Sequence, residues 1–579
     1  MLHDARQVDA GSELDTDICI IGGGAAGITL ARAFSSSPLR VTVLEAGGEA
    51  YDPVTNDAYK GRNVGLPYFT LDMCQLRFLG GNTNAWGGWC RPLDEIDFAP
   101  RPWVESSGWP IPRDELLPYY DMARDICQLK SDNFEVSRWI EHLGDERARV
   151  LPFDPAKIET AIYQFSPPTR FGEAYADDLR RSPNITCLLH ANVVNIETRY
   201  DAREVTGLTV ACLNGHRFHV RAKIYVLAAG GTENARLLLA SRDVMPNGLG
   251  NQHDLVGRYF MEHPHTQRRI IPYTRQADVA LYGLKFHDRH VSARLSLPVA
   301  LQEAEGLLNY SANIHPVYLG HKTEGWMALR KFVLSLSRSR QRDPYLRFPP
   351  YGAKQVDAMD AFRILRELPA VTAAGFLQLL QPNRFISGYI LESKSEQAPN
   401  PDSRILLEHE RDVFGVNRIK LDWKMLPIDR RTVVRAEEIV DAELRRLGIG
   451  ELEPLPPELV EGWPDNLEGG WHQLGMTRMD PDPRRGVVDT DGRLHEVGNL
   501  FVTGGSVFPT VGAAPPTLTV VSMALRLADH LRAVLGRTDA DIGSTRTPAA
   551  APTLAPAPAR VLEPLEMPLH IPTAAARMG

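Results

Sequence analysis

Several features that mark common classes of protein are missing from this sequence. Its six cysteines are scattered, and none forms a CxxC or CxxCH pair. This spacing argues against zinc, iron–sulfur and attached haem sites. No uninterrupted run of about 18 apolar residues occurs, so no transmembrane segment is expected. Basic residues are not in excess, because the net charge is −8, and we expect no nucleic-acid partner.

The polar N-terminal stretch "MLHDARQVDAGSELDTD" has neither the apolar segment of a secretory signal nor a twin-Arg pair. We therefore expect a cytoplasmic location. With 579 residues, the chain is too long for one hydrophobic core, and two or more domains are expected.

A strand, a glycine-rich turn and a helix follow the polar start. The apolar run 18–21 predicts the strand, and "ITLARAF" predicts the helix. Gly22, Gly24 and Gly27 lie between them, and a second apolar run ends at Glu45. This order of elements is the dinucleotide-binding βαβ pattern.

Each residue of this pattern has a physical role. Gly22 permits a tight turn, Gly24 lets the backbone approach a pyrophosphate, and Gly27 allows helix and strand to pack closely. The free N–H groups of the helix start favour phosphate, and Glu45 can accept hydrogen bonds from ribose hydroxyls. An ordinary α/β turn is the alternative. The pattern does not separate NAD from FAD, but its place at the start of a long chain favours FAD.

Later segments indicate a domain assembled from separated pieces. Residues 76–98 are rich in glycine and small polar residues, which is typical of a loop against a flat ligand. Strand-like runs return within 186–231 and are followed by a helix, "TENARLLLAS". Near the C-terminus, "NLFVTGG" predicts a last strand, and a long helix starts near Pro516 and Thr517, where its positive end could face a flavin.

The region from 275 to 460 has a different pattern. Its runs "LLNYSANIHPVYL", "RFISGYILESKSEQ", "SRILLEHERD" and "NRIKLDW" predict strands of an antiparallel sheet. Within it, residues 320–385 predict a helical insertion with a basic cluster, interpreted as a solvated face or as a lid or docking surface. That cluster comprises Arg330, Lys331, Arg338, Arg340 and Arg342. The Pro/Ala-rich stretch 536–579 is typical of a flexible tail.

Taken together, five motifs make the sequence resemble the glucose–methanol–choline (GMC) oxidoreductases over about residues 15–535, apart from part of the insertion. They are the glycine turn with Glu45, "GGNTNAWGGWCRP", "VLAAGGTENARLLL", "DLVGRYFMEHP" and "WHQLGMTRM … NLFVTGGSVFPT". The nearest branch is similar to bacterial sugar and alcohol dehydrogenases related to pyranose oxidases.

The resemblance implies an α/β fold with two domains, of the GMC and p-hydroxybenzoate-hydroxylase type. A Rossmann-like FAD-binding domain is expected over 15–274, completed by 470–535. A substrate domain built on an antiparallel sheet is expected over 275–469. The implied FAD-binding residues are Gly22, Gly24, Ala25, Ala26, Gly27, Glu45, Ala46, Gly80, Gly81, Thr83, Asn84, Trp86, Gly87, Gly88, Val193, Ala229, Gly230, Gly505, Ser506, Pro516 and Thr517.

The resemblance also assigns a base. In this family the histidine of an HxxG motif faces the flavin and accepts the proton of the substrate hydroxyl; here that residue is His472. A general base of ordinary pKa near neutrality suits this role, and such a base typically contributes about 10²–10⁴-fold in rate. A histidine buried in the core with no catalytic role is the alternative.

Two positions depart from the family pattern. Pro515 stands where relatives usually carry a second His or Asn, so the usual partner for the substrate oxygen is missing. Ala85 stands where relatives with covalent flavin carry a histidine, which implies non-covalent FAD.

Other polar and aromatic residues have weaker assignments. Trp89, Trp471 and Gln473 are substrate-contact candidates, with core packing as the alternative for the tryptophans. His263 and His265 would share a face of an extended segment, but the sequence supplies no further partner pair, so a structural role and no metal site are expected.

The leading hypothesis is a two-domain FAD enzyme that oxidises a CH–OH group of a sugar, glycoside or other small alcohol by hydride transfer to flavin N5, with His472 as general base. Electrons would then pass to O₂, a quinone or a redox protein. Because of Pro515, decarboxylation, elimination or C–C cleavage on the same fold is an alternative. A second alternative is a non-catalytic flavoprotein that serves as an assembly partner through the insertion.

Overall fold

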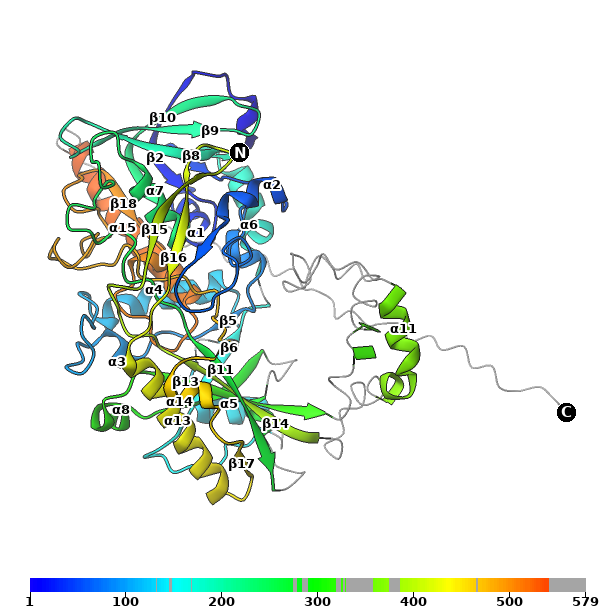
Figure 1. Cartoon of the computed structure of the whole chain (residues 1–579). Helices are drawn as coiled ribbons and strands as arrows, with labels where there is room; N and C mark the ends of the chain where they lie inside the picture. The colour runs from blue at the N-terminus through cyan, green and yellow to red at the C-terminus, as the bar shows by residue number, and fades with distance from the viewer. Residues whose placement is uncertain are drawn as a thin grey trace.

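The structure is a computed structural model (Figure 1). It describes residues 1–540 apart from 132, 145–147, 168, 274–278, 284–289, 319–323, 326–327, 330–357, 374–385 and 465–466. The basic cluster of the insertion and the stretch from 541 onwards therefore lie outside the described residues.

An eight-stranded sheet forms the upper part of Figure 1. Its centre is buried because Ile18–Ile21 and the neighbouring strand runs are continuously apolar, as expected for parallel strands covered on both faces. The strands run in the order β1 (Leu2–Asp4), β7 (Ile185–Leu189), β3 (Val41–Leu44), β2 (Glu13–Ile21), β10 (Arg217–Leu227), β9 (Val205–Ala211) and β8 (Asn192–Thr198), and β18 (Leu500–Val502) pairs with β10.

The first βα turn of the sequence prediction lies at the centre of this sheet. β2 ends at Ile21 and α1 (Ala25–Ala33) begins three residues after the turn starts. α1 packs against α15 (Thr517–Ala540), which in turn packs against α4 (Arg113–Ile126). A helix about 500 residues after the first turn therefore packs beside α1, as the separated motifs predicted.

A seven-stranded antiparallel sheet forms the lower part of Figure 1. α13 (Pro427–Arg446) covers one face, and Ala436 and Ile439 lie in the same apolar cluster as the sheet side chains. The strands run in the order β17 (Gly450–Leu452), β11 (His265–Pro272), β14 (Ile386–Ser395), β13 (Tyr310–Tyr318), β12 (Val291–Ser296), β6 (Glu159–Phe165) and β5 (Trp89–Cys90).

A third, three-stranded sheet corrects one expectation. β15 (Arg404–Arg411) and β16 (Asn417–Asp422) were expected beside β13 and β14, but they pair with each other and with β4 (Gly61–Asn63). The β16–β4 pairing is parallel and joins residues about 360 positions apart, so no local pattern could indicate it.

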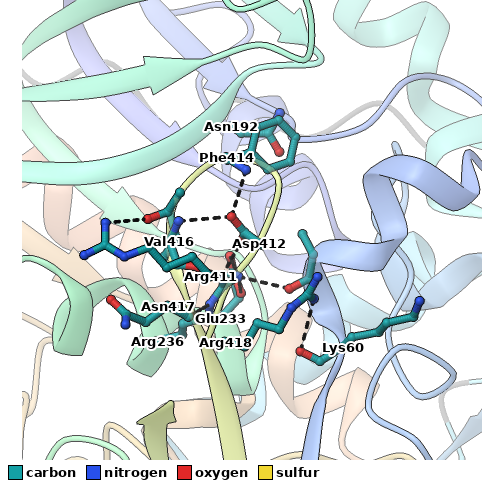
Figure 2. Close-up of polar contacts among 12 residues, drawn as sticks. Lys60, Asn192, Glu233, Arg236, Arg411, Asp412, Phe414, Val416, Asn417 and Arg418 are labelled. Atoms are coloured by element: carbon teal, nitrogen blue, oxygen red, sulfur yellow. Dashed lines mark hydrogen bonds and ion pairs between the residues drawn. The ribbon is translucent and has the colours of Figure 1, made fainter. Parts of the chain in front are cut away.

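Buried ion pairs attach the β15–β16 hairpin to α7 (Gly231–Ala240), as Figure 2 shows. Nη2 of Arg236 lies 2.5 Å from a carboxylate oxygen of Asp412, and Nη1 lies 3.3 Å from Glu233. The three side chains are at most 6% exposed. Because unpaired buried charges are costly, this network fixes where the hairpin sits.

The remaining helices are short. They are α2 (Pro53–Asn56), α3 (Glu95–Phe98), α5 (Val136–Leu143), α6 (Phe171–Arg181), α8 (Val299–Glu305), α11 (Ala358–Arg366) and α14 (Pro457–Glu461), with 3₁₀ turns that include η3 (Gly81–Asn84) and η7 (Gly505–Val507). Of the insertion, α11 is described; it lies to the side of the two large sheets in Figure 1.

The predicted domain boundary at residue 275 does not separate the two large sheets. β5, β6 and β11 precede residue 275, yet they pair in the seven-stranded sheet. The boundaries 15–274 and 275–469 therefore stay a prediction. All six cysteines are buried and form no disulfide. Over the described residues, no helix combines the length and apolar character needed to span a bilayer.

Candidate active site

A cavity of about 1540 Å³ extends from the β2–α1 turn to the seven-stranded sheet. Typical small-molecule sites measure about 300–1,000 Å³, so this cavity has room for a large cofactor and a second molecule. At the turn, Gly22 has a φ of +109°, and a Cβ there would lie 2.6 Å from the carbonyl oxygen of Ala228. A Cβ at Gly24 would meet nothing within 4 Å, so backbone is open to the cavity at that point.

Glu45 closes the same end of the cavity. Its two oxygens accept hydrogen bonds of 2.8 Å from the N–H groups of Gly23 and Gly47. Burial raises the pKa of this carboxyl group. Each oxygen keeps a further lone pair, so Glu45 braces the turn and can still accept a hydrogen bond from a ligand hydroxyl.

The loop around η3 forms one wall and is held by side chains. Nη1 of Arg170 donates to the carbonyl oxygens of Thr83, at 2.8 Å, and Trp86, at 3.1 Å. The indole N–H of Trp86 donates to the carbonyl oxygen of Thr169 at 2.9 Å. These bonds keep Gly81, Thr83 and Trp86 on the cavity surface.

His472 lines the far part of the cavity, beyond the glycine turn. Its backbone N–H donates to both oxygens of Glu262 at 2.9 Å. A Cβ at Gly470 would lie 2.6 Å from Nδ1 of His472, so the ring occupies space that only glycine leaves free. Trp471 has a φ of +60°, a strained conformation for a tryptophan and one that is often found at functional sites.

The hydrogen bonds of two histidines determine which ring nitrogen carries the proton. Nε2 of His263 lies 2.9 Å from the carbonyl oxygen of Gly512, which only accepts, so this nitrogen must donate. Burial lowers the pKa of His263 to about 4, so its ring is neutral and its Nδ1 is an acceptor. Nδ1 of His472 lies 2.8 Å from that acceptor and must carry a proton.

It follows that Nε2 of His472 is left as the unprotonated nitrogen. Burial lowers the pKa of His472 well below its ordinary value of 6.5, so the ring is neutral. A neutral imidazole with a bare Nε2 on a cavity wall has the form that a general base requires.

Glu262 is buried beside these rings, and its carboxylate accepts hydrogen bonds from several groups. It accepts from the hydroxyl of Tyr68 at 2.6 Å and from the N–H groups of His263 and Gly470 at 2.8 and 3.0 Å. Burial raises its pKa to about 7. Ligand atoms of Glu262, His263 and His472 lie within 4.8 Å of one another, which would suit a metal ion, but the hydrogen bonds just described account for that closeness.

The polar face of the seven-stranded sheet forms another wall of this part of the cavity. His265, Arg294, Glu392 and Lys394 contribute to it, together with Trp89 from β5. Pro515, at the start of the segment that leads into α15, lies on the cavity wall as well.

Comparison with known proteins identifies the family. A family model described as FAD dependent oxidoreductase matches residues 17–346, more than half of the chain, and one described as GMC oxidoreductase matches residues 399–524. This chain is an FAD-dependent GMC oxidoreductase. The resemblance, the α/β fold class and the FAD cofactor predicted above are thereby confirmed.

Named relatives cover nearly the whole chain at low identity. Paromamine 6'-oxidase from Streptomyces fradiae is 26% identical, with 88% of this chain and 90% of that protein aligned. 2-Methyl-1,2-propanediol dehydrogenase from Mycolicibacterium austroafricanum is 24% identical, with 92% and 97% aligned. A structure of formate oxidase from Aspergillus oryzae has a TM-score of 0.52 at 17% identity, covering 92% of this chain and 100% of that one, which shows a shared fold.

The cavity of this GMC oxidoreductase fits FAD on its own chemistry. Nε2 of Gln473 and Oγ1 of Thr503 are buried, lie on residues of the cavity wall and have no hydrogen-bond partner among the described residues. Buried polar atoms normally have hydrogen-bond partners, so a ligand with polar ring atoms, such as a flavin, is expected beside these two. The open backbone at Gly24 and the start of α15 at Thr517 would hold the phosphates and the ring, respectively.

Most residues predicted to bind FAD lie on the cavity wall. They are Gly22, Gly24, Ala25, Ala26, Glu45, Ala46, Gly81, Thr83, Trp86, Gly87, Gly88, Val193, Ala229, Gly230, Gly505, Pro516 and Thr517. The substrate candidates Trp89, Trp471 and Gln473 lie there as well, and so does Ala85, although non-covalent attachment of FAD stays a prediction.

Four predicted FAD-binding residues do not line the cavity and instead shape its walls. A Cβ at Gly27 would lie 1.9 Å from the carbonyl oxygen of Gly22, so Gly27 permits the close turn. Nδ2 of Asn84 donates to the carbonyl oxygens of Leu79 and Gly81 at 2.9 and 3.0 Å. Gly80 has a φ of +98°, and Oγ of Ser506 accepts a hydrogen bond of 3.0 Å from Asn234.

Sequence reasoning missed the charged sheet face and the role of His263. In "ILESKS", Glu392 and Lys394 are two positions apart within a predicted strand, which places both on one face. That spacing was the available signal. His263 was expected to be structural, but it contacts His472 directly.

Proposed function

We propose that this GMC oxidoreductase oxidises an alcohol or sugar hydroxyl group, with His472 as the general base. The observation that carries the proposal is the hydrogen-bond chain from Gly512 through His263 to His472, which leaves Nε2 of His472 free as an acceptor. Two of the relatives named above, an oxidase of paromamine and a dehydrogenase of a propanediol, support a hydroxyl substrate.

Bound FAD supplies a hydride acceptor in this cavity. The substrate carbon loses a hydride, and its hydroxyl oxygen loses a proton to Nε2 of His472, which leaves a carbonyl product. Removing the proton prevents positive charge from building on the carbon. Glu262 keeps the backbone of His472 in place, and His263 holds the ring proton on Nδ1.

The test is anaerobic reduction of the flavin by a panel of alcohols and sugars in wild type and His472→Ala. We expect His472→Ala to retain FAD and to reduce it about 10²–10⁴-fold more slowly. His409→Ala, at an exposed histidine on β15, is the matched control and should behave as wild type. Unchanged reduction in His472→Ala would contradict the assignment of the base.

Pro515 favours a second candidate, namely chemistry other than hydroxyl oxidation on the same fold. Its ring cannot donate a hydrogen bond, so the partner that relatives use for the substrate oxygen is missing from this wall. In that case the flavin would stay oxidised and yellow without air while product forms. Bleaching by an alcohol would exclude this candidate.

A further inference from the structure

The seven-stranded sheet turns one apolar and one polar face in opposite directions. Along β13, Tyr310, Ala312 and Ile314 lie in the apolar cluster under α13. Successive side chains of a strand alternate, so Ser311 and Asn313 lie on the opposite face. Arg294 of β12 and Lys394 of β14 belong to that face and line the cavity. Arg294 stands between the buried apolar residues Ala293 and Leu295, and Lys394 stands between the buried Ser393 and Ser395.

Arg294 is a buried cation that forms no ion pair with a carboxylate among the described residues, although the charge of Glu392 acts on it from farther away. Its side chain is 1% exposed, and its guanidinium lies over the rings of Trp89, at 4.0 Å, and Tyr163, at 4.4 Å. Nη1 donates a single hydrogen bond of 3.3 Å to Ser311. Nε and Nη2 have no hydrogen-bond partner among the described residues. The rings of Trp89 and Tyr163 fix the plane of the guanidinium, and the N–H groups on Nε and Nη2 remain able to donate to a ligand.

Lys394 adds a second positive charge. Its Nζ lies 5.4 Å from the centre of the Trp89 ring and 3.5 Å from a carboxylate oxygen of Glu392. Burial and the nearby Arg294 lower the pKa of Lys394 to about 8, so the amine is charged at neutral pH.

One carboxylate therefore faces two cations. Glu392 is also held by His315, at 3.0 Å, and this contact and Lys394 keep its pKa low. Among the other carboxylates that line the cavity, Glu468 is solvent-exposed, and Glu324 and Asp360 pair with Arg363. Because burying an unbalanced charge is costly, the excess of one positive charge among the buried groups Arg294, Lys394 and Glu392 indicates that a monoanion belongs beside them.

The geometry points to a substrate that carries a carboxylate group in addition to the hydroxyl that is oxidised, with Arg294 and Lys394 as its anchors. A guanidinium edge matches a carboxylate in two parallel hydrogen bonds, whereas a dianionic phosphate would exceed the charge available. The inference rests on the proposed function for the identity of the oxidised group, but the anchoring of the anion is independent of it.

The anchor and the base line the same cavity, and the charges of Lys394 and Arg294 act on the ring of His472. His265 is directly opposite Lys394 across the β11–β14 pair, and such neighbours have Cβ atoms about 4.5–5.5 Å apart. His263, two residues earlier, contacts the ring of His472. The carboxylate of a hydroxy acid or a sugar acid can therefore contact the anchor while its hydroxyl contacts His472.

The first experiment measures binding to the oxidised holoenzyme, so it needs no turnover. Perturbation of the flavin absorbance is titrated with matched acid and amide pairs: glucuronate and glucuronamide, lactate and lactamide, mandelate and mandelamide. We expect at least one acid to bind about 10- to 100-fold more tightly than its amide, as charge-assisted hydrogen bonds provide. Equal binding within every pair, or no acid that binds, would overturn the inference. Glucose 6-phosphate binding more tightly than glucuronate would overturn the choice of a carboxylate.

The second experiment removes the anchor. Arg294→Gln should abolish the preference for the acid and leave amide binding unchanged, and Lys394→Met is the second variant if Arg294→Gln does not fold. Arg269→Gln, at an exposed arginine of β11, is the control and should retain the preference. An equal loss of acid and amide binding in Arg294→Gln would overturn the inference. Acids that bind but never reduce the flavin would instead contradict the proposed oxidation and leave the anchor intact.

Discussion

At the scale of single residues, burial keeps the two histidines of the site neutral. His263 and His472 contact each other through Nδ1, an arrangement in which protonation of both rings would be unfavourable. Burial is the largest cause of the lowered pKa of each. The buried surroundings of His472 thus keep it in the neutral form that a base requires, even without substrate.

The first prediction concerns pH. A base must be neutral to act, and the pKa of His472 lies well below 6.5, so activity should be lost only as pH falls through that lowered value. We expect the rate of flavin reduction to be constant from neutral pH down to 6.5, with the acid limb of the profile below 6.5. Stopped-flow reduction at a series of pH values measures this. A rate that has already halved at pH 6.5 would contradict the neutral, buried base.

His263 is predicted to act by orienting the proton on His472. His263→Leu removes the acceptor and should lower the reduction rate at least about tenfold, while the flavin content and substrate Kd stay unchanged. His263→Asn can still accept from His472 and donate to Gly512, so it should recover most of the rate. Equal rates in the two variants would show that only the volume of the ring matters.

At the scale of elements, the β2–α1 turn depends on glycine for the approach of backbone to backbone. A Cβ at Gly27 would overlap the carbonyl oxygen of Gly22. We expect Gly27→Ala to bind FAD about tenfold or more weakly, because overpacking of this kind costs about 1–3 kcal/mol. The ratio of flavin to protein absorbance after dialysis measures it. Gly536→Ala, where a Cβ meets nothing within 4 Å, should retain full flavin.

The β15–β16 hairpin depends on the ion pair between Arg236 and Asp412. Asp412→Asn leaves the buried guanidinium short of a charged partner, and we expect a loss of about 3–5 kcal/mol in the free energy of unfolding. Urea denaturation measures this loss. Arg435→Gln, which removes the half-exposed pair with Glu305, should cost less than about 1 kcal/mol. Similar losses for the two variants would contradict the importance of burial.

At the scale of the whole molecule, the cavity joins parts that are far apart in sequence. Its walls come from the first turn near residue 22, the polar sheet face, the segment around His472 and the start of α15. A ligand in this cavity contacts several of these parts at once and stabilises their arrangement.

Removal of FAD should therefore lower the melting temperature of the protein as a whole. A ligand at 100 times its Kd adds about 2.7 kcal/mol to the stability of the folded state. We expect the apoprotein to melt several degrees lower and added FAD to restore the original value. An apoprotein that melts at the same temperature would show that the parts are held together without the cofactor.

The motifs of the first turn were predictable because their constraints are local. Gly22, Gly24 and Glu45 act within 25 residues, where spacing alone places them on one cavity wall. The charged sheet face was not predictable in the same way. Arg294 and Lys394 belong to strands about 100 residues apart, and β13 lies between them in the sheet.

The sequence by itself determined the βαβ turn, the alternation of each strand and the presence of a histidine in a motif typical of GMC oxidoreductases. The tertiary structure alone decided that His263 contacts His472, and that two buried cations on the sheet face the same cavity. The reason is that periodicity defines which face of an element a side chain occupies, whereas long-range packing defines what that face meets.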